Sequence, residues 1–389
     1  MEYRGQIHNK YNIVYFIDGL GMGCAERLMV PILRNLDRED FVPRVCVFQV
    51  REGNPVAEEI KASGISVDFL AIPYLRDLTA IPRLRDYLKH VRADLVHTQL
   101  EFADTLGNIA SKLLRLPSVC TIHTMPSRPF LFKSKIHQYL EWLCLRYFCD
   151  RVISVSEGAR QHHIAISNAV PEKVITIYNG IDLIQFQKID REHERVVVRS
   201  ELRIPHQAKV FVTVAVLREL KGIQYMIRAM PIILASCPNA YYLIVGDGEY
   251  LGALLDETEK LGLREHIIFA GMRRDIPRIL SAGDIFVLPT LTEALPTVLA
   301  EAMAARLPIV ASRVGGIPEM LVDGQNGRMV PPGNADDLAR ICNALLLNSR
   351  LRKLMGETGW NVVNKKFNIM EQVQQLKSLY LDLITAYGK

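Results

Sequence analysis

Two glutamates with a fixed spacing are the residues in this chain best suited to chemistry. Glu293 and Glu301 stand eight positions apart, one after an apolar run and one inside a segment of helical period that begins at Pro296. At ~1.5 Å per helical residue, this spacing separates the carboxylates by roughly the length of a sugar joined to a ribose. One could accept hydrogen bonds from sugar hydroxyls and the other from a ribose, with the helix N-terminus facing a diphosphate. The plainer alternative is two acids, one at a helix start and one on a solvated face.

A glycine-rich turn follows the first predicted strand. The segment Gly19–Arg27 reads G-L-G-M-G-C-A-E-R. In the dinucleotide-binding fingerprint G-x-G-x-x-G, counted from Gly19, the third glycine would be at position 24, where this chain has Cys24. No strand that ends in an acidic residue follows ~20 residues later, and both departures disfavour a dinucleotide site. Gly21 and Gly23 would still let a ligand approach a helix N-terminus, where free N–H groups attract an anion or a sugar hydroxyl. The alternative is a tight strand-to-helix turn that binds nothing.

Several common sites are missing from the sequence. It contains no G-x-x-x-x-G-K-[ST] loop, no H-E-x-x-H helix and no Cys/His cluster with zinc spacing. No aspartate lies two residues from another, and such a pair commonly holds a divalent cation on a sugar nucleotide. The seven cysteines are scattered and odd in number, which favours reduced thiols in a cytoplasmic protein. We therefore expect neither a metal ion nor an organic cofactor.

The elements that must position these residues follow an alternation of short β-branched runs and longer segments of helical period. This alternation is typical of a parallel sheet covered by helices. Strands are predicted at 12–17, 44–50, 66–70, 94–98, 118–123, 151–155 and 174–178, and again at 209–215, 240–245, 266–270, 284–288, 308–311 and 327–330. The stretch 181–207 breaks the pattern with the charge-dense Asp190–Arg195, which we interpret as a bridge between two units.

The predicted fold class is α/β, with two doubly wound, Rossmann-like parallel sheets. A length of 389 residues suits two or three domains, at ~150 residues for each. We place one domain at 1–185, a second at 186–370 and a terminal helix at 371–389. Ligands of such sheets bind beyond the carboxyl ends of the strands, so the residues that follow each strand are the candidates for a site.

The segment around the two glutamates resembles the E-x7-E signature of glycosyltransferase family 4. A predicted strand leads into Leu288–Glu293, L-P-T-L-T-E, and then into Glu301–Ala304, E-A-M-A. Further stretches similar to family motifs follow in the family's order: Gly23–Arg27, Asp94–Thr98, Asn179–Asp182, Gly246–Glu249 and Val314–Glu319. The resemblance covers nearly the whole chain. It implies a GT-B fold, in which two domains face each other across a cleft, the last helix crosses back to the first domain, and a sugar is transferred with retention from a nucleotide-diphosphate donor without a metal.

The resemblance also implies roles for individual residues. Glu293 contacts the transferred sugar, Lys221 neutralises the donor diphosphate, and His123 lies beside the donor sugar once the cleft closes, bonding to the sugar or to a phosphate oxygen. Glu301 holds the ribose. The full set expected to bind the donor is Arg218, Lys221, Glu301, Gly23, Pro296, Thr297 and Val298.

The sequence departs from the family pattern at two positions. The usual phosphate-binding arginine would fall at position 216, where this chain has Val216. Arg218 either replaces it as a phosphate ligand or is a surface arginine. Ala294 stands where the family often has glycine. On the acceptor side, Gly21 is interpreted as acceptor-lining, and His97 as structural or acceptor-lining.

Charge and aromatic residues bear on the partners. A formal net charge of +5 fits an anionic partner but is too small to indicate nucleic acid. Arg76–Arg92 is rich in cations, and 128–148 mixes aromatic with basic residues, as interfacial helices do. No apolar run reaches the ~18 residues of a membrane span. We expect a cytoplasmic protein, either with peripheral contact to the inner membrane face or with these helices packed in the core.

The predicted function is a retaining glycosyltransferase that moves a sugar from a UDP-sugar, or a GDP-sugar as second choice, to a hydroxyl of a cell-envelope glycan or glycolipid. One alternative is a phosphorylase of the same fold, which would need a lysine-bound pyridoxal cofactor that nothing in the sequence signals. Another is a nucleotide-sugar epimerase, which would lack the E-x7-E context. The third is a non-catalytic partner that binds sugar nucleotides, to which Val216 and Ala294 would point.

Overall fold

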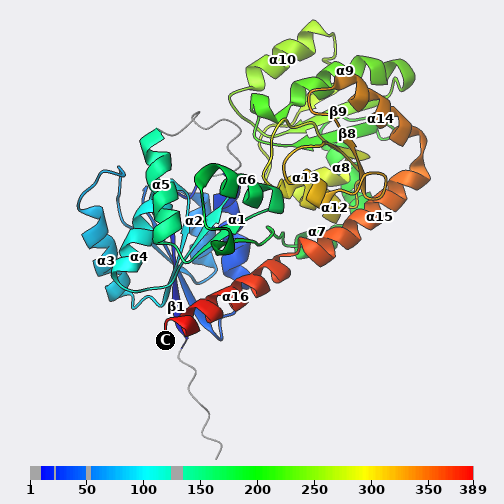
Figure 1. Ribbon diagram of the computed structural model, residues 1–389. Helices are drawn as coiled ribbons and strands as arrows, with labels where there is room; N and C mark the ends of the chain where they lie inside the picture. Colours follow the sequence, from blue (N-terminus) through cyan, green and yellow to red (C-terminus); the bar gives the residue numbers. More distant parts are fainter. Residues whose placement is uncertain (1–9, 22, 50–53, 124–134, 389) are drawn as a thin grey trace, which may run out of the picture. The chain divides into compact units, whose positions relative to one another are not determined.

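The protein forms two compact units, each with its own parallel sheet (Figure 1). The computed structural model describes residues 10–21, 23–49, 54–123 and 135–388. The first unit comprises the chain up to Asn179 together with Ile369–Lys389, and the second comprises Gly180–Asn368. The second unit is therefore inserted into the chain of the first, ahead of its last helix.

The first unit is built on a seven-stranded sheet with the order β3-β2-β1-β4-β5-β6-β7, all neighbours parallel. The strands are β1 (Tyr11–Ile17), β2 (Phe41–Val47), β3 (Ser66–Phe69), β4 (Leu95–Gln99), β5 (Ser118–Ile122), β6 (Arg151–Ser154) and β7 (Val174–Thr176). Every residue of β4 is buried, as expected of a strand covered on both faces. The strand order reverses between β1 and β4, which is where ligands of such sheets bind.

Helices cover both faces of this sheet. One face carries α1 (Cys24–Asn35), α2 (Pro55–Ala62) and α16 (Ile369–Ala386), which share a core with β1 and β2. The other carries α3 (Ala80–His90), the π-helical turn η1 (Ala103–Gly107), α4 (Asn108–Leu113), α5 (Lys135–Tyr147) and α6 (Glu157–Ser167). Successive strand residues point to opposite faces, so Tyr15 enters the first core and Phe16 the second.

The last helix, α16, is held in the first unit by polar as well as apolar contacts. The buried hydroxyl of Tyr380 lies 3.0 Å from the hydroxyl of Tyr15. Lys377 forms ion pairs of 2.6 Å with both Asp37 and Asp40. These contacts fix the helix on the face of the sheet that α1 also covers.

The second unit contains a six-stranded parallel sheet with the order β10-β9-β8-β11-β12-β13. The strands are β8 (Lys209–Val214), β9 (Ala240–Val245), β10 (Ile267–Phe269), β11 (Ile285–Leu288), β12 (Ile309–Ser312) and β13 (Gly327–Val330). The longer helices are α8 (Arg191–Glu201), α9 (Ile223–Ser236), α10 (Leu251–Lys260), α12 (Thr297–Ala304), α14 (Ala335–Leu347) and α15 (Ser349–Lys366), and the shorter ones include α7 (Ile184–Gln187), α11 (Ile276–Ser281) and α13 (Ile317–Met320). All the predicted strands are found, and the α/β class with two doubly wound sheets is confirmed.

The charge-dense stretch that we interpreted as a bridge is a helix of the second unit, so that interpretation was wrong. Asp190 caps α8 by accepting a hydrogen bond of 3.2 Å from the amide of His193. Further along α8, Arg199 is fully buried. The sequence pattern fails here because a buried guanidinium cannot be told from a solvated one by residue type alone.

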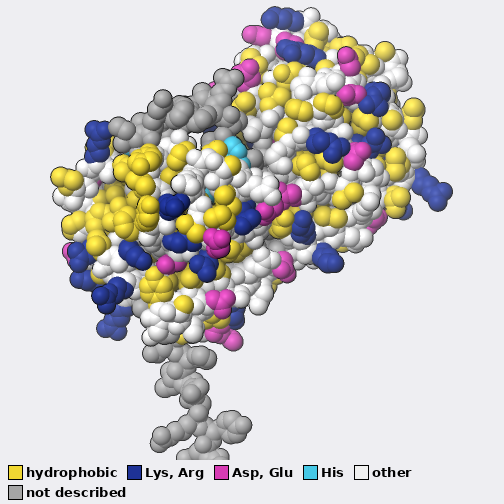
Figure 2. Space-filling view, in the orientation of Figure 1, with side chains coloured by type: hydrophobic (Ala, Val, Ile, Leu, Met, Phe, Trp, Pro, Cys, Tyr) yellow, Lys and Arg dark blue, Asp and Glu magenta, His cyan; other side chains and the backbone are white. Residues whose placement is uncertain are grey.

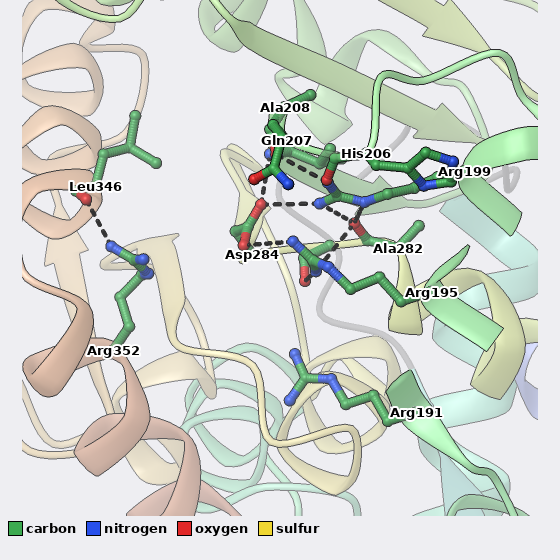
Figure 3. A network of polar contacts seen from close by, with 12 residues as sticks. Arg191, Arg195, Arg199, His206, Gln207, Ala208, Ala282, Asp284, Leu346 and Arg352 are labelled. Carbon is green, nitrogen blue, oxygen red and sulfur yellow. Dashed lines mark hydrogen bonds and ion pairs between the residues drawn. The ribbon is translucent and has the colours of Figure 1, made fainter. Parts of the chain in front are cut away.

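The buried Arg199 joins α8 by hydrogen bonds to the amino-terminal edge of the second sheet (Figure 3). Its donors reach the carbonyl oxygens of Ala282, His206 and Ala208 at 2.7 to 3.1 Å. It also pairs at 3.0 Å with Asp284, which accepts a further bond of 2.8 Å from Arg195. Every N–H of the Arg199 guanidinium therefore has an acceptor, which makes its burial tolerable.

Candidate functional site

The candidate site lies at the carboxyl edge of the second sheet, where the loops that follow β8, β9 and β11 are tied together by backbone hydrogen bonds. The amide of Leu217 donates to the carbonyl of Asp247 at 2.9 Å, which joins the loops after β8 and β9. The amide of Leu291 donates to the carbonyl of Leu220 at 2.8 Å, which joins the loops after β8 and β11. The loops therefore form one connected surface.

Two glycines in left-handed conformations let these loops come into contact. Gly222 has a φ of +67°, and a Cβ added there would lie 2.0 Å from the carbonyl oxygen of Pro289. Gly315, after β12, has a φ of +51°, and its Cβ would lie 1.6 Å from the carbonyl oxygen of Glu293. No larger residue fits at either place without moving a backbone. The main chain of Glu293 is thus fixed by the loop after β12.

Lys221 and Glu293 face each other across this surface. Lys221 ends a short 3-10 turn, η3 (Glu219–Lys221), and Glu293 lies in the loop before α12. The ammonium of Lys221 forms an ion pair with Oε1 of Glu293, and the two side chains are 26% and 14% exposed. Arg218, at the start of the same turn, is exposed. Two cations and one carboxylate therefore reach solvent at the same edge.

The first turn of α12 brings the other expected donor-binding residues to this edge. Pro296 is the N-cap residue, and its carbonyl accepts a hydrogen bond of 3.0 Å from the amide of Leu299. Thr297 and Val298 follow in the first turn and are partly exposed. Glu301 lies four residues after Thr297 and is also partly exposed. Residues four apart share a helix face, so Thr297 and Glu301 lie on the same side of α12.

The glycine turn of the first unit lies at the carboxyl end of β1 and carries its own carboxylate. Gly23 is the N-cap residue of α1. The side chain of Glu26 folds back over it, so that a Cβ on Gly23 would lie 2.3 Å from one carboxylate oxygen, and a Cβ on Gly21 would lie 3.4 Å from the other. A carboxylate thus occupies the helix N-terminus where we expected an anion. A ligand that donates hydrogen bonds suits this turn better than a phosphate.

His123 directly follows β5 and is a neutral imidazole. Its Nε2 lies 3.2 Å from Oε1 of Gln99. Its Nδ1 is buried and has no hydrogen-bond partner among the residues that the structure describes, which omit 124–134. Burial lowers the pKa of His123 to about 4. The ring therefore uses one nitrogen for a neighbour, and its other nitrogen is buried without a partner among the described residues.

His97 is structural in this fold. It is 1% exposed in the middle of β4, with Nδ1 at 2.6 Å from the hydroxyl of Tyr380 and Nε2 at 2.7 Å from the hydroxyl of Thr121. Burial, together with the nearby His123, lowers its pKa to about 3. Because both ring nitrogens are used inside the core, His97 has none left for an acceptor.

The sequence analysis missed two polar residues at the carboxyl edge of the first sheet. Gln99, the last residue of β4, contacts His123 as described above. Asp18 follows β1 and accepts hydrogen bonds of 2.7 and 3.0 Å from the amides of Ala103 and Phe102, at the start of η1. Each stands where a predicted strand ends, and that position is the signal that could have found them.

We expected neither a metal ion nor a membrane-spanning segment, and the structure can be searched for both only within the residues that it describes. Among residues 10–21, 23–49, 54–123 and 135–388, no group of three or more His, Cys, Asp or Glu side chains is placed to hold a metal ion. Within the same ranges, no helix combines the length and the apolar character needed to cross a bilayer.

Each of the two units matches a sequence model of glycosyltransferases. Residues 195–362 match the sequence model for glycosyl transferases group 1, and residues 25–185 match that for Glycosyltransferase Family 4. The UDP-Gal:alpha-D-GlcNAc-diphosphoundecaprenol alpha-1,3-galactosyltransferase of Escherichia coli is 27% identical over 322 residues, covering 80% of this chain and 81% of its own length. The N-acetyl-alpha-D-glucosaminyl L-malate synthase of Bacillus anthracis is 28% identical over 325 residues, covering 80% of each.

Solved structures share the architecture. HepE of Anabaena, crystallised with UDP-glucose, superposes with a TM-score of 0.84 at 24% identity, covering 96% of this chain and 100% of its own. WaaG, a glycosyltransferase involved in lipopolysaccharide biosynthesis, superposes with a TM-score of 0.73 at 16% identity, covering 95% and 99%. The fold is GT-B, as in these structures.

Proposed function

We propose that this chain, which belongs to the glycosyltransferases of group 1 and family 4, transfers a sugar with retention of configuration from a UDP-sugar to a hydroxyl acceptor, without a catalytic metal ion. The observation that carries the proposal is the pairing of Lys221 with Glu293 at the loop edge of the second sheet. The E. coli relative is named for UDP-Gal, and HepE was crystallised with UDP-glucose, which favours UDP over GDP as the donor nucleotide.

In this proposal Lys221 changes partner when the donor binds. The diphosphate takes the ammonium of Lys221, and the released carboxylate of Glu293 accepts hydrogen bonds from hydroxyls of the transferred sugar. Cleavage of the bond between the anomeric carbon and the phosphate oxygen leaves extra negative charge on the diphosphate. Lys221 and the exposed Arg218 stabilise that charge, so two protein cations do the electrostatic work that a metal ion does elsewhere.

The remaining donor contacts come from α12. The first turn of α12, at Thr297 and Val298, faces the diphosphate with the positive end of the helix, and Glu301 accepts hydrogen bonds from the ribose. The acceptor hydroxyl forms its new bond to the anomeric carbon on the face that the phosphate leaves, and its proton passes to the departing phosphate oxygen. No protein base or nucleophile is needed, and the configuration is retained.

The acceptor in this proposal is a glycan or a lipid-linked saccharide. Support comes from exposed apolar side chains of the first unit: Tyr74 and Leu78, which precede α3, are 71% and 92% exposed, and Tyr139 and Tyr147 of α5 are 60% and 59% exposed. Figure 2 shows hydrophobic side chains gathered over the region of α3 and α5, with Lys and Arg side chains around them. Tyr147 thus points to solvent rather than into the core. Exposed aromatic residues among cations suit the surface of an anionic bilayer.

Vesicle sedimentation tests the membrane contact. The wild type should bind vesicles that contain phosphatidylglycerol more strongly than vesicles of phosphatidylcholine alone, and Leu78→Glu should weaken that binding several-fold. Leu347→Glu is the matched control, since Leu347 is 88% exposed in the second unit. Equal losses in the two variants, or no preference for the anionic lipid, would remove the membrane from the proposal.

Binding and product analysis test the reaction itself. UDP should raise the melting temperature more than GDP or ADP, since a ligand at a hundredfold excess over its Kd stabilises by ~2.7 kcal/mol. Lys221→Ala should abolish the shift, and Lys260→Ala, at an exposed position of the same unit, should keep it. Transfer in the presence of EDTA, with the anomeric configuration of the product read by NMR, checks metal independence and retention. Binding of UDP without turnover of any UDP-sugar would point instead to a non-catalytic sugar-nucleotide-binding protein.

A further inference from the structure

A buried glutamine ends β4 beside His123. Gln99 is 1% exposed and lies between Ile17 of β1 and Thr121 of β5 in the register of the sheet. Its amide oxygen lies 3.2 Å from Nε2 of His123. An amide oxygen can only accept, so the proton of the neutral imidazole is on Nε2. The lone pair is then on Nδ1, the buried nitrogen that has no partner among the described residues.

The backbone that follows Gln99 is strongly constrained. Leu100, the next residue, has a φ of +73°, a left-handed conformation that a leucine keeps only where its surroundings enforce it. The carbonyl of Leu100 accepts a bond of 2.8 Å from the amide of Asp104. Asp18 holds the amides of Phe102 and Ala103. The turn is thus fixed at both ends, and Gln99 is held at a set distance from His123.

The neighbours on the same face of the sheet are also neutral. His97 lies two residues before Gln99 and therefore points the same way. Its ring is occupied by the hydroxyls of Tyr380 and Thr121. His97 is also the titratable group that interacts with His123, and burial keeps both rings uncharged. Neither a carboxylate nor a cation of the described residues competes with Gln99 for the ring.

We propose that Gln99 is a positioning residue that holds His123 as the Nε2–H tautomer and so presents Nδ1 as a hydrogen-bond acceptor to the substrate. The matching group is a hydroxyl or an amide N–H. A phosphate oxygen of the donor diphosphate carries no proton at neutral pH, so it cannot donate to Nδ1. Of the two ligands that the sequence left open for His123, the sugar fits and the phosphate does not. The identity of the ligand rests on the proposed function, whereas the tautomer does not.

Nitrogen NMR of the full chain, labelled with 15N-histidine, tests the tautomer without any assay of transfer. Long-range proton–nitrogen correlations distinguish a protonated Nε2 from a protonated Nδ1, and loss of one set of signals in His123→Asn assigns the ring. The wild type should show a protonated Nε2 and a bare Nδ1 from pH 6 to 8. A protonated Nδ1 in the wild type overturns the proposal, whether or not the protein transfers a sugar.

Two substitutions of Gln99 separate positioning from packing. Gln99→Met keeps the volume but removes the acceptor, so the two tautomers of His123 should become mixed. Gln99→Glu should keep the tautomer and make the ring titrate at a higher pH, because a carboxylate stabilises the imidazolium. Gln372→Met is the matched control, since Gln372 is 6% exposed in the same unit and lies 3.5 Å from Asn179. An unmixed tautomer in Gln99→Met would contradict the proposal.

Kinetics then connect the tautomer to the substrate. Gln99→Met should lower kcat/KM for the donor about tenfold, the effect of one hydrogen bond, while inhibition by free UDP stays unchanged. In the His123→Asn background the same substitution should have no further effect. Weaker UDP inhibition in Gln99→Met would mean that the ring contacts the diphosphate, and it would overturn the assignment to the sugar. A wild type that transfers no sugar would refute the proposed function and leave the NMR result standing.

Discussion

The ammonium of Lys221 is bound to the carboxylate of Glu293, although the two residues come from loops after different strands of the second sheet. The pair joins the residue expected to hold the diphosphate to the residue expected to hold the sugar. An anionic ligand that approaches Lys221 must therefore compete with Glu293. A substitution of Glu293 should therefore affect nucleotide binding and sugar transfer differently.

Glu293→Gln should bind UDP several-fold more tightly than the wild type and lose transfer by about two orders of magnitude. The amide no longer competes for Lys221, so the cation is free for the diphosphate, but a group needed by the sugar in the transition state is weakened. Calorimetric titration with UDP and initial rates with the UDP-sugar measure the two effects. Glu259→Gln, at an exposed ion pair with Arg264, is the control. UDP affinity that falls in Glu293→Gln would show that the pair does not compete with the ligand.

Gly222→Ala should destabilise the second unit more than Gly262→Ala. The two glycines have nearly the same φ, +67° and +65°, so both variants carry the left-handed cost of about 1–2 kcal/mol. Only at Gly222 does the added Cβ meet a backbone atom, at 2.0 Å from Pro289, whereas nothing lies within 4 Å at Gly262. Urea unfolding of the two variants should differ by at least ~2 kcal/mol, with weaker UDP binding in Gly222→Ala. Equal losses would mean that the loops can separate freely.

Asp284→Asn should destabilise the second unit by about 3 kcal/mol at neutral pH, because it leaves Arg199 buried without its counter-charge. Burial alone would raise the pKa of Asp284, but Arg195, the amide of Val210 and Arg199 together hold that pKa below its usual range. A carboxyl whose pKa is lower in the folded state stabilises the fold when the pH is above its pKa in the unfolded chain. It loses that contribution as the pH falls through its pKa in the folded protein. The difference in the free energy of unfolding between wild type and variant should therefore become smaller below about pH 4. A gap that is constant down to pH 3 would refute the ion pair, and Asp256→Asn, at an exposed site, is the control.

His97→Gln should destabilise the first unit at pH 7.5 and matter less as the pH falls. The folded-state pKa of about 3 lies below the unfolded value of about 6.5. Between these values the unfolded chain binds a proton that the folded chain refuses, so the histidine's contribution declines by ~1.4 kcal/mol per pH unit. Urea unfolding at pH 7.5 and 5.5 measures the change, with His90→Gln, at an exposed position, as control. A difference that does not change with pH would argue against a buried neutral ring.

Each unit has its own fluorescent reporter for these measurements. The chain has two tryptophans, Trp142 in the first unit and Trp360 in the second. Trp360→Phe leaves Trp142 to follow the first unit, and Trp142→Phe leaves Trp360 to follow the second. The unfolding of the two units can then be separated even if the whole chain does not unfold in one step.

The sheets could be predicted from the sequence because a buried parallel strand has a simple pattern. The apolar run of β11, for example, is buried throughout. The position of Glu293 after that strand followed from the same rule, since loops at the carboxyl edge carry the ligand-binding residues. Local pattern therefore sufficed for the sheets and for where the loops begin.

The sequence did not predict which side chains contact one another. The charges of α8 were predicted to be solvated, whereas Arg199 is buried, and its acceptors include Ala282 and Asp284, which are 83 and 85 residues away. Likewise, nothing local shows that Glu26 folds over Gly23, or that His97 bonds to Tyr380, 283 residues away. Such contacts depend on which elements become neighbours in the fold, and residue type does not report that.

The place of α16 in the first unit also governs the order in which the protein can be completed on the ribosome. The second unit, Gly180–Asn368, is a continuous stretch that can fold as soon as it emerges. The first unit begins earlier but must wait for α16, whose Tyr380 and Leu376 belong to its core. During that interval an apolar surface beside β1 remains open to water and to chaperones. Synthesis of α16, rather than of β1, therefore sets the moment at which the core of the first unit can be covered.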